Sequence, residues 1–234
     1  YPPFFSVIKD NKRTVVENPL INTENGYRID FDDLAKKAAD AKILILCNPH
    51  NPVGRVWTED ELRKIAAICL ENGVLILSDE IHSDLIYTGR HTPLASLDPA
   101  IADRTITCVA PSKTFNTAGL QASAIIFSNP ALYTPFAAAV QALHIGKSNV
   151  LGTTALQAAY SHGEPWLEEL LPYLAANAAL LVKTLAAKAP KIKVHLPEGT
   201  YLAWLDCRAL ALTHPELRSF CAKDARAGLN EGTT

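Results

Sequence analysis

The sequence contains no methionine among its 234 residues, and no two of its five cysteines stand three positions apart, as in a Cys-x-x-Cys motif. A complete natural chain starts with methionine, so we expect this sequence to be an interior portion of a longer protein. The cysteines are widely spaced and mostly lie in apolar segments, which predicts buried free thiols and a reducing, cytoplasmic location. They are Cys47, Cys69, Cys108, Cys207 and Cys221.

The sequence also lacks an excess of charge of either sign. It has 22 Lys and Arg residues against 24 Asp and Glu residues, with no basic block, which predicts no nucleic-acid partner and no binding to an anionic membrane surface. The longest apolar runs, residues 35–47 and 136–145, are short or interrupted, so we expect no transmembrane helix. No basic leader is present, which predicts no signal peptide. Hydrophobic residues make up 48% of the chain, enough for a globular core.

The first part of the chain alternates between apolar runs and helical patterns. Residues 42–47 form a continuous apolar run that predicts a strand buried on both faces. Thr58 and Glu61 have the spacing of a capping box, which predicts a helix that ends at Asn72-Gly73. Further strands are expected over residues 74–78, 105–110 and 122–128. Such alternation predicts an α/β fold with a mostly parallel sheet flanked by helices.

The second part of the chain is rich in helical patterns and predicts a smaller α+β unit. Helices are expected over residues 130–145, 150–161, 165–188 and 215–227, and strands over residues 192–196 and 200–206. We expect a domain boundary near Gly163. It gives a large domain over residues 1–163 and a small domain over residues 164–234.

Three polar clusters follow the buried strands, where ligands bind in open α/β sheets. They contain Asn51, Asp79 and Lys113, and the separations of 28 and 34 residues each leave room for one crossover. An amine, a carboxylate and an amide at one sheet edge match the needs of pyridoxal 5'-phosphate: a lysine for a Schiff base, a carboxylate beside the pyridine nitrogen and a donor for the phenolic oxygen. The sequence therefore predicts a pyridoxal-phosphate site.

The order of these motifs resembles a known family. Asn-Pro-His-Asn-Pro-Val-Gly, Ser-Asp-Glu-Ile and Ser-Lys-Thr-Phe-Asn begin at positions 48, 78 and 112 and are similar to motifs of the class I/II aminotransferase superfamily, the fold-type-I pyridoxal-phosphate enzymes. Gly-Thr-Tyr-Leu-Ala-Trp-Leu-Asp, from position 199, resembles the cystathionine β-lyase-like C–S lyase subgroup. The resemblance covers essentially the whole chain.

The resemblance implies a role for each candidate residue. Lys113 is the Schiff-base lysine and the base at the substrate Cα, and Asp79 pairs with the pyridine nitrogen. Asn51 and His82 serve the phenolic oxygen, and the Asn51–Pro52 bond is expected to be cis. Ser112 binds the phosphate, and Tyr1 stacks on the cofactor ring. Two positions depart from the aminotransferase pattern around the phosphate, namely Ala110 and Gln121.

Structural explanations remain open for several of these residues. Asp79 could cap a helix, His82 could be an ordinary loop histidine, and Tyr1 could be a core aromatic residue. His50 is interpreted as structural. The histidines show no metal-ligand spacing with cysteine or carboxylate, so no metal is expected.

The resemblance implies a carbon–sulfur β-lyase that acts on L-cystathionine or a cysteine S-conjugate, a small-molecule amino-acid substrate. It also implies a homodimer. One alternative is an aminotransferase, which shares the first chemical steps. The other is a non-catalytic regulator on the same fold.

Overall fold

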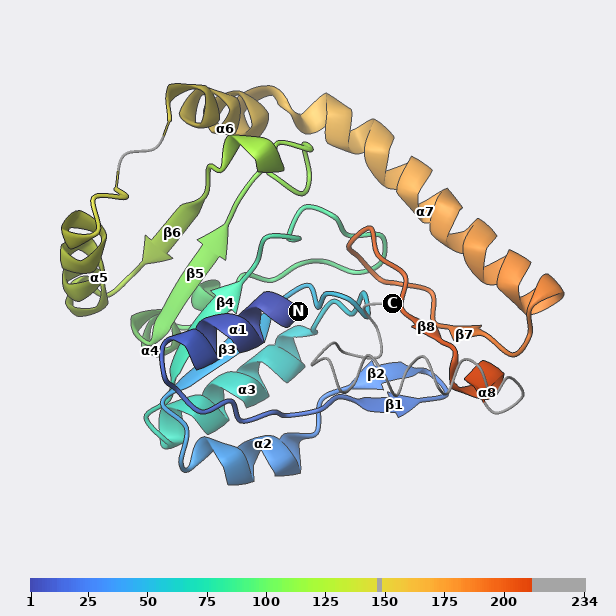
Figure 1. Cartoon of the computed structure of the whole chain (residues 1–234), viewed down its shortest axis with the longest axis horizontal. Helices are drawn as coiled ribbons and strands as arrows, with labels where there is room; N and C mark the ends of the chain where they lie inside the picture. The colour runs from blue at the N-terminus through green and yellow to red at the C-terminus, as the bar shows by residue number, and fades with distance from the viewer. Residues whose placement is uncertain (147–148, 212–234) are drawn as a thin grey trace.

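The computed structural model describes residues 1–146 and 149–211 (Figure 1). The helix expected over residues 215–227 lies outside this part of the chain. The strands are β1 (Ile21–Thr23), β2 (Gly26–Arg28), β3 (Ile43–Cys47), β4 (Leu75–Asp79), β5 (Thr105–Val109), β6 (Ala124–Phe127), β7 (Lys193–Val194) and β8 (Leu205–Asp206). The α-helices are α1 (Pro2–Asp10), α2 (Phe31–Ala38), α3 (Glu59–Glu71), α4 (Pro99–Asp103), α5 (Pro130–Ala142), α6 (Val150–His162), α7 (Glu164–Lys188) and α8 (Arg208–Ala211).

The central sheet has the order β3-β4-β5-β6. The first three strands are parallel and β6 runs antiparallel to β5, so the expected mostly parallel α/β sheet is confirmed. Cys47 pairs with Asp79, and Asp79 pairs with Cys108. This register brings the carboxyl ends of three strands to one sheet edge, which is where the polar clusters were expected.

The hydrophobic core lies between the sheet and the helices α2 and α3. Its fully buried side chains include Trp57, Leu62, Ile65, Val74 and Ile76. Helix α3 begins as predicted, because the Thr58 side chain accepts the N–H of Glu61 while the Glu61 side chain accepts the N–H of Thr58. The helix ends at Glu71, with Asn72 as its C-cap, and Gly73 follows with φ +67°, a conformation that glycine adopts readily.

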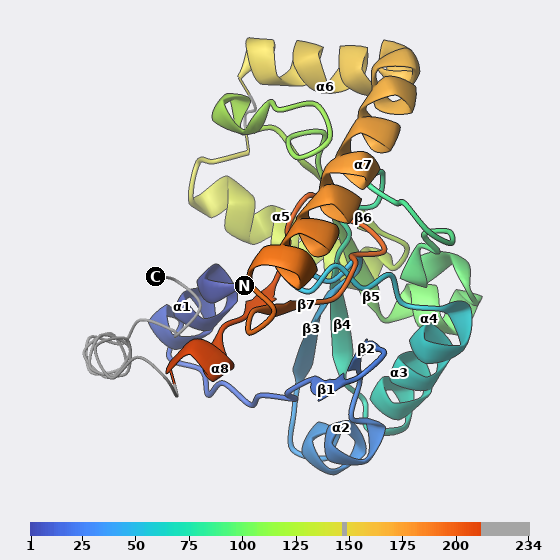
Figure 2. The same cartoon turned by 90° about the vertical axis from the view of Figure 1, so that its right-hand side faces the viewer.

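The prediction that β3 is buried on both faces is wrong for its first half. Ile43 is 57% exposed, and only Leu46 and Cys47 in this strand are buried. Strand β3 is an edge strand of the described sheet, and helix α1 lies on the side opposite α3 (Figure 2). An apolar run alone does not distinguish a strand covered on both faces from one covered on a single face.

Helices α5 and α7 bury no side chain completely among the described residues. Helix α7 has 25 residues, and an 18-residue window in it reaches a mean hydropathy of 1.5 with none of it buried. By length and composition alone it could cross a membrane, contrary to the expectation from the sequence. However, the indole N–H of Trp166 in α7 donates to the carbonyl of Thr114 over 3.3 Å, so this helix is attached to the segment that carries Lys113.

Strands β7 and β8 are shorter than predicted, with two residues each. The link between them turns back toward the carboxyl ends of the central strands (Figure 1). Gly199 in this link forms an antiparallel bridge with Ile86, in the loop that follows β4. The boundary near Gly163 stays a prediction.

Candidate active site

Five of the six predicted site residues line one small hollow at the carboxyl ends of β3, β4 and β5. Tyr1, Asn51, Asp79, His82 and Lys113 enclose it together with Cys47 and Ile81, and its volume is about 50 Å³. Ser112 is half-buried beside Lys113 but does not line the hollow. The structure thus brings together an amine, a carboxylate, an amide and an imidazole from three segments far apart in the sequence.

Asp79 is the last residue of β4 and lines this hollow. Burial raises the pKa of Asp79, and the N–H of Ile81, 3.2 Å from Oδ1, and the charge of Lys113 act in the opposite direction. A half-buried carboxylate that accepts one hydrogen bond from the described residues favours a cation beside it. Asp79 is therefore suited to hold a protonated ring nitrogen, and the helix-capping explanation is wrong, because β4 is followed by a turn.

His82 is 2% exposed, and neither ring nitrogen has a hydrogen-bond partner among the described residues. Burial, with a smaller contribution from Lys113, lowers the pKa of His82 to about 4. The ring is therefore neutral at pH 7, with one donor and one acceptor unused. A buried polar group without a partner is uncommon, and because His82 lines the hollow, its ring nitrogens can bond to a group bound there. The ring of His82 also contacts the ring of Tyr201 edge-on, with the centroids 5.5 Å apart.

Lys113 sits in a tight turn after β5. The N–H of Phe115 donates to Pro111 over 2.8 Å, and the N–H of Thr117 donates to Ser112 over 3.1 Å. The neighbouring Thr114 is 1% exposed, and its hydroxyl donates to Asp84 Oδ2 over 2.8 Å. Asp84 was not predicted as a site residue, although it lies only five residues after Asp79.

Asn51 belongs to a compact loop after β3. The Asn48–Pro49 and Asn51–Pro52 peptide bonds are both cis, the second as the resemblance implied. Two hydrogen bonds close the loop. The N–H of His50 donates to the carbonyl of Arg55 over 2.7 Å, and the N–H of Gly54 donates to the carbonyl of His50 over 2.8 Å. This closure places Asn51 at the hollow.

His50 packs edge-on against Trp57, with the ring centroids 5.6 Å apart. Burial lowers the pKa of His50 to about 4. These contacts support its interpretation as a structural residue.

Glu80 is a second buried residue that sequence analysis did not assign. It is 2% exposed and accepts hydrogen bonds from the Ser78 hydroxyl over 2.8 Å and from the Leu94 N–H over 3.1 Å. His91 Nε2 lies 2.8 Å from its second carboxylate oxygen. These bonds fix the turn that carries Asp79 and His82.

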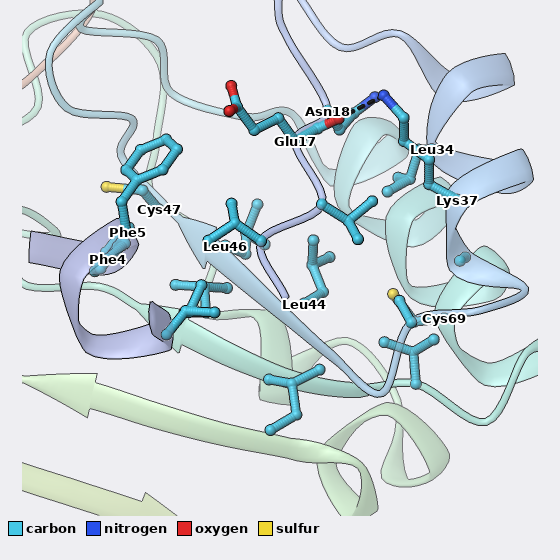
Figure 3. Close-up of a pocket in the computed structure, with 18 of the residues that line it drawn as sticks. Phe4, Phe5, Glu17, Asn18, Leu34, Lys37, Leu44, Leu46, Cys47 and Cys69 are labelled. Atoms are coloured by element: carbon cyan, nitrogen blue, oxygen red, sulfur yellow. Dashed lines mark hydrogen bonds between the residues drawn. The ribbon is translucent and has the colours of Figure 1, made fainter. Parts of the chain in front are cut away.

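A much larger cavity of about 800 Å³ adjoins the hollow at Tyr1, Cys47 and Asn51 (Figure 3). It borders β3 beside α1 and α2, and Figure 3 shows apolar side chains such as Leu44 and Leu46 around it. Lys113, Asp79 and His82 line the small hollow but not this cavity. We therefore assign the candidate site to the small one.

The donors in the hollow fit the polar edge of pyridoxal phosphate. Lys113 offers the amine for the aldehyde carbon, Asp79 a carboxylate for the ring nitrogen, and Asn51 with the unpartnered His82 two donors for the phenolic oxygen. The fold and site together define a class of protein: an α/β enzyme scaffold with a lysine–aspartate pair for a pyridine cofactor.

Comparison with known proteins gives the family. Residues 1–225 match aminotransferase class I and II, and the chain belongs to this family. It is 45% identical over 236 residues to "Cystathionine beta-lyase PatB" of Bacillus subtilis, a match that covers 100% of this chain and 61% of that protein. The chain thus spans less than two thirds of that relative's length.

Two solved structures have the same fold. Cystalysin from Treponema denticola, which contains a pyridoxal 5'-phosphate cofactor, has a TM-score of 0.89 and 40% identity over 98% of this chain and 59% of its own. The pyridoxal-phosphate-bound C–S lyase from Staphylococcus hominis has a TM-score of 0.84 and 40% identity over 91% of this chain and 54% of its own. These structures confirm the predicted fold-type-I architecture.

Proposed function

We propose that the complete protein is a pyridoxal-phosphate-dependent carbon–sulfur β-lyase. Its substrate would be L-cystathionine or a related cysteine S-conjugate, and its products a thiol, pyruvate and ammonia. The observation that carries this proposal is the hollow in which Lys113, Asp79, Asn51 and His82 meet. The similarity to a cystathionine β-lyase and to C–S lyases supports this specificity.

Among the residues of the hollow, Lys113 is assigned to proton transfer as well as binding, and the others are assigned to binding. When bound, pyridoxal phosphate supplies an electron sink for negative charge at the substrate Cα. Lys113 Nζ is the attachment point of the cofactor and, when free, takes the proton from the substrate Cα. Asp79 would accept a hydrogen bond from the ring nitrogen and keep it protonated, because a half-buried carboxylate favours a cation next to it.

The remaining residues orient the cofactor. Asn51 and the neutral His82 donate hydrogen bonds to the phenolic oxygen. Tyr1, which lines the hollow, would stack on the ring, and Ser112, which does not line it, would bind the phosphate. Among the described residues that line the hollow, burial lowers the pKa of His82 to about 4, which makes it a weak base, and Asp79 is assigned to the ring nitrogen, so proton transfer at Cα is assigned to Lys113.

We further propose a homodimeric, cytoplasmic enzyme whose domains meet near Gly163. Apolar side chains on α6 and α7 support a subunit interface, since Val150, Leu151 and Tyr173 are 79%, 72% and 65% exposed. The free thiols of Cys47, Cys69, Cys108 and Cys207 support a reducing compartment. Light scattering on the complete protein tests the dimer, and a monomer at micromolar concentration would reject it.

The deciding experiment is a pyruvate assay of the complete protein with L-cystathionine and pyridoxal phosphate. The proposal predicts pyruvate without any added keto acid, and its loss in K113A but not in K36A, which alters an exposed lysine on α2. Pyruvate or transamination products that require a keto acid would instead support the aminotransferase. Failure of the protein to bind the cofactor would support the regulator.

A further inference from the structure

The turn formed by residues 197–201 is held between two loops of the large domain. The N–H groups of Glu198 and Gly199 donate to the carbonyl of Gly54 over 2.8 and 3.1 Å. The N–H groups of Tyr87 and Thr88 donate to the carbonyl of Glu198 over 2.8 and 3.1 Å. The turn therefore joins the Asn51 loop on one side and the loop that follows His82 on the other.

The side chain of Glu198 reinforces this attachment. Its Oε2 accepts hydrogen bonds from Arg55 Nε over 2.9 Å and from the Val56 N–H over 2.7 Å. Arg55 also binds Glu61 over 3.1 Å and the carbonyl of Tyr27, and its side chain is only 19% exposed. Because the guanidinium is held by several partners at once, the position of Glu198 is defined more narrowly than in a surface ion pair.

Thr200, two residues after Glu198, has a backbone conformation that residues with a branched Cβ rarely adopt. Thr200 has φ +67° and is completely buried. Its N–H donates to the carbonyl of Leu85 over 2.8 Å, and its carbonyl accepts the hydroxyl of Tyr87. Such strain persists only where the surroundings fix the backbone, and it is concentrated at functional sites.

The consequence of this backbone conformation is the position of Tyr201. Its ring meets His82 edge-on, with an interplanar angle of 72°. His82 lines the hollow that holds Lys113 and Asp79. A chain of contacts thus runs from Glu198 through Thr200 and Tyr201 to an imidazole of the candidate site.

From these contacts, we propose that Glu198 and Arg55 are positioning residues that hold Tyr201 against His82. Tyr201 packs edge-on against the imidazole of His82, which lines the hollow, so removal of the Tyr201 ring should expose a side chain that is otherwise available to a ligand in the hollow. The proposal rests on the proposed function only for the identity of that ligand. It makes the turn of the smaller unit part of the site rather than a remote connection.

A turn that only stabilised the fold would make the same hydrogen bonds. The test therefore measures the exposure of His82 itself. The complete protein, with pyridoxal phosphate bound and without it, is treated with diethyl pyrocarbonate, which acylates neutral imidazoles. The rate of modification is then followed at each histidine by mass spectrometry of peptides. His91, which lies in the Glu80 cluster, reports general loosening of the fold.

The proposal predicts that E198A and Y201A raise the modification rate of His82 about fivefold or more, while that of His91 stays unchanged. In the double variant the rate is no higher than in Y201A, because Glu198 acts through Tyr201. The matched control E59A removes an exposed ion pair to Arg63 at 2.7 Å and leaves His82 unchanged. If E198A does not fold, E198Q carries the test, with a smaller increase at His82 and an unchanged His91.

An unchanged rate at His82 in the folded Glu198 variants would overturn the proposal, and so would a double variant in which the two increases multiply. An increase at His82 that is matched at His91 would also overturn it, since the turn would then only stabilise the fold. The readout needs no turnover. A protein that makes no pyruvate but shows the predicted pattern would reject the lyase assignment alone.

Discussion

Thr114 Oγ1 donates a hydrogen bond to Asp84 Oδ2 over 2.8 Å, which ties the residue next to Lys113 to the loop that follows β4. The carbonyl of Thr114 is held at the same time by Trp166 of α7. The backbone that carries the candidate catalytic amine is thus fixed from two directions. Small displacements of a reacting group reduce rates strongly, so this bond has a kinetic consequence.

We predict that T114V lowers kcat of the complete protein about 10- to 100-fold with little change in KM, whereas T114S stays close to wild type. Valine keeps the shape of the side chain but removes the donor to Asp84. Initial rates of pyruvate formation measure the effect. T134V is the control, because the exposed Thr134 hydroxyl donates to the carbonyl of Pro130 within helix α5. Equal activity of T114V and T114S would contradict the prediction.

Asp79 shows a conflict between stability and function. Burial raises the pKa of Asp79 above its ordinary value of 3.8. At a pH above this raised pKa, the folded protein holds a carboxylate that burial disfavours, so the charge lowers the free energy of unfolding. D79N should therefore raise the denaturation midpoint of the cofactor-free protein at pH 7, and the gain should vanish below pH 3.8, where both states are protonated. The same variant should lower kcat about 100- to 1000-fold, because the partner of the ring nitrogen is lost.

Chemical denaturation across this pH range, together with the pyruvate assay, measures both effects of D79N. The matched control is D103N, which changes an exposed carboxylate at the end of α4. A D79N protein that is less stable than wild type at pH 7, or fully active, would contradict the assignment of Asp79.

The buried histidines predict a loss of stability in acid. Burial lowers the pKa values of His50 and His82 to about 4, below the ordinary value of 6.5. Between these values the unfolded chain takes up protons that the folded protein does not, so the free energy of unfolding falls as the pH falls. Each residue contributes about 3 kcal/mol across this window. H82Q should remove its share, and H162Q, at an exposed position, should not.

Urea denaturation of the cofactor-free protein at several pH values between 7 and 4 measures this dependence. A slope that is the same in wild type and in H82Q would show that His82 is not buried as a neutral imidazole.

Gly54 offers an independent test of the turn formed by residues 197–201. It has φ +74°, and a Cβ at this position would lie 2.4 Å from Pro197 Cβ. Gly73 has a similar φ of +67° but no atom within 4 Å, so G73A measures the cost of the left-handed backbone alone. G54A should lower the free energy of unfolding by about 1–3 kcal/mol more than G73A does. It should also raise the diethyl pyrocarbonate reactivity of His82. Equal losses of stability in the two variants would contradict the packing of this turn.

Local patterns in the sequence predicted most of the elements that position the site. The capping box at Thr58 and the apolar runs before Asn51, Asp79 and Lys113 fix a helix and three strands, and the polar residues after those strands meet in one hollow. Parallel strands place their carboxyl ends at one edge whatever lies between them. This is why the motif spacing was sufficient.

The rest depends on contacts between distant positions, which leave no periodic signal in a single sequence. Glu198 bonds to Arg55 across 143 residues, and Thr114 bonds to Asp84 across 30 residues. The exposed face of β3 and the apolar surface of α7 were missed for a related reason, because hydrophobicity does not reveal which segment covers a surface.

The most direct test of the account locates the cofactor on the chain. The complete protein is incubated with pyridoxal phosphate, reduced with borohydride and digested, and the phosphopyridoxyl group is mapped by mass spectrometry. The account predicts a single modified peptide with the added group on Lys113, and no such product in K113A. A label spread over exposed lysines, or retained at one other lysine in K113A, would contradict it.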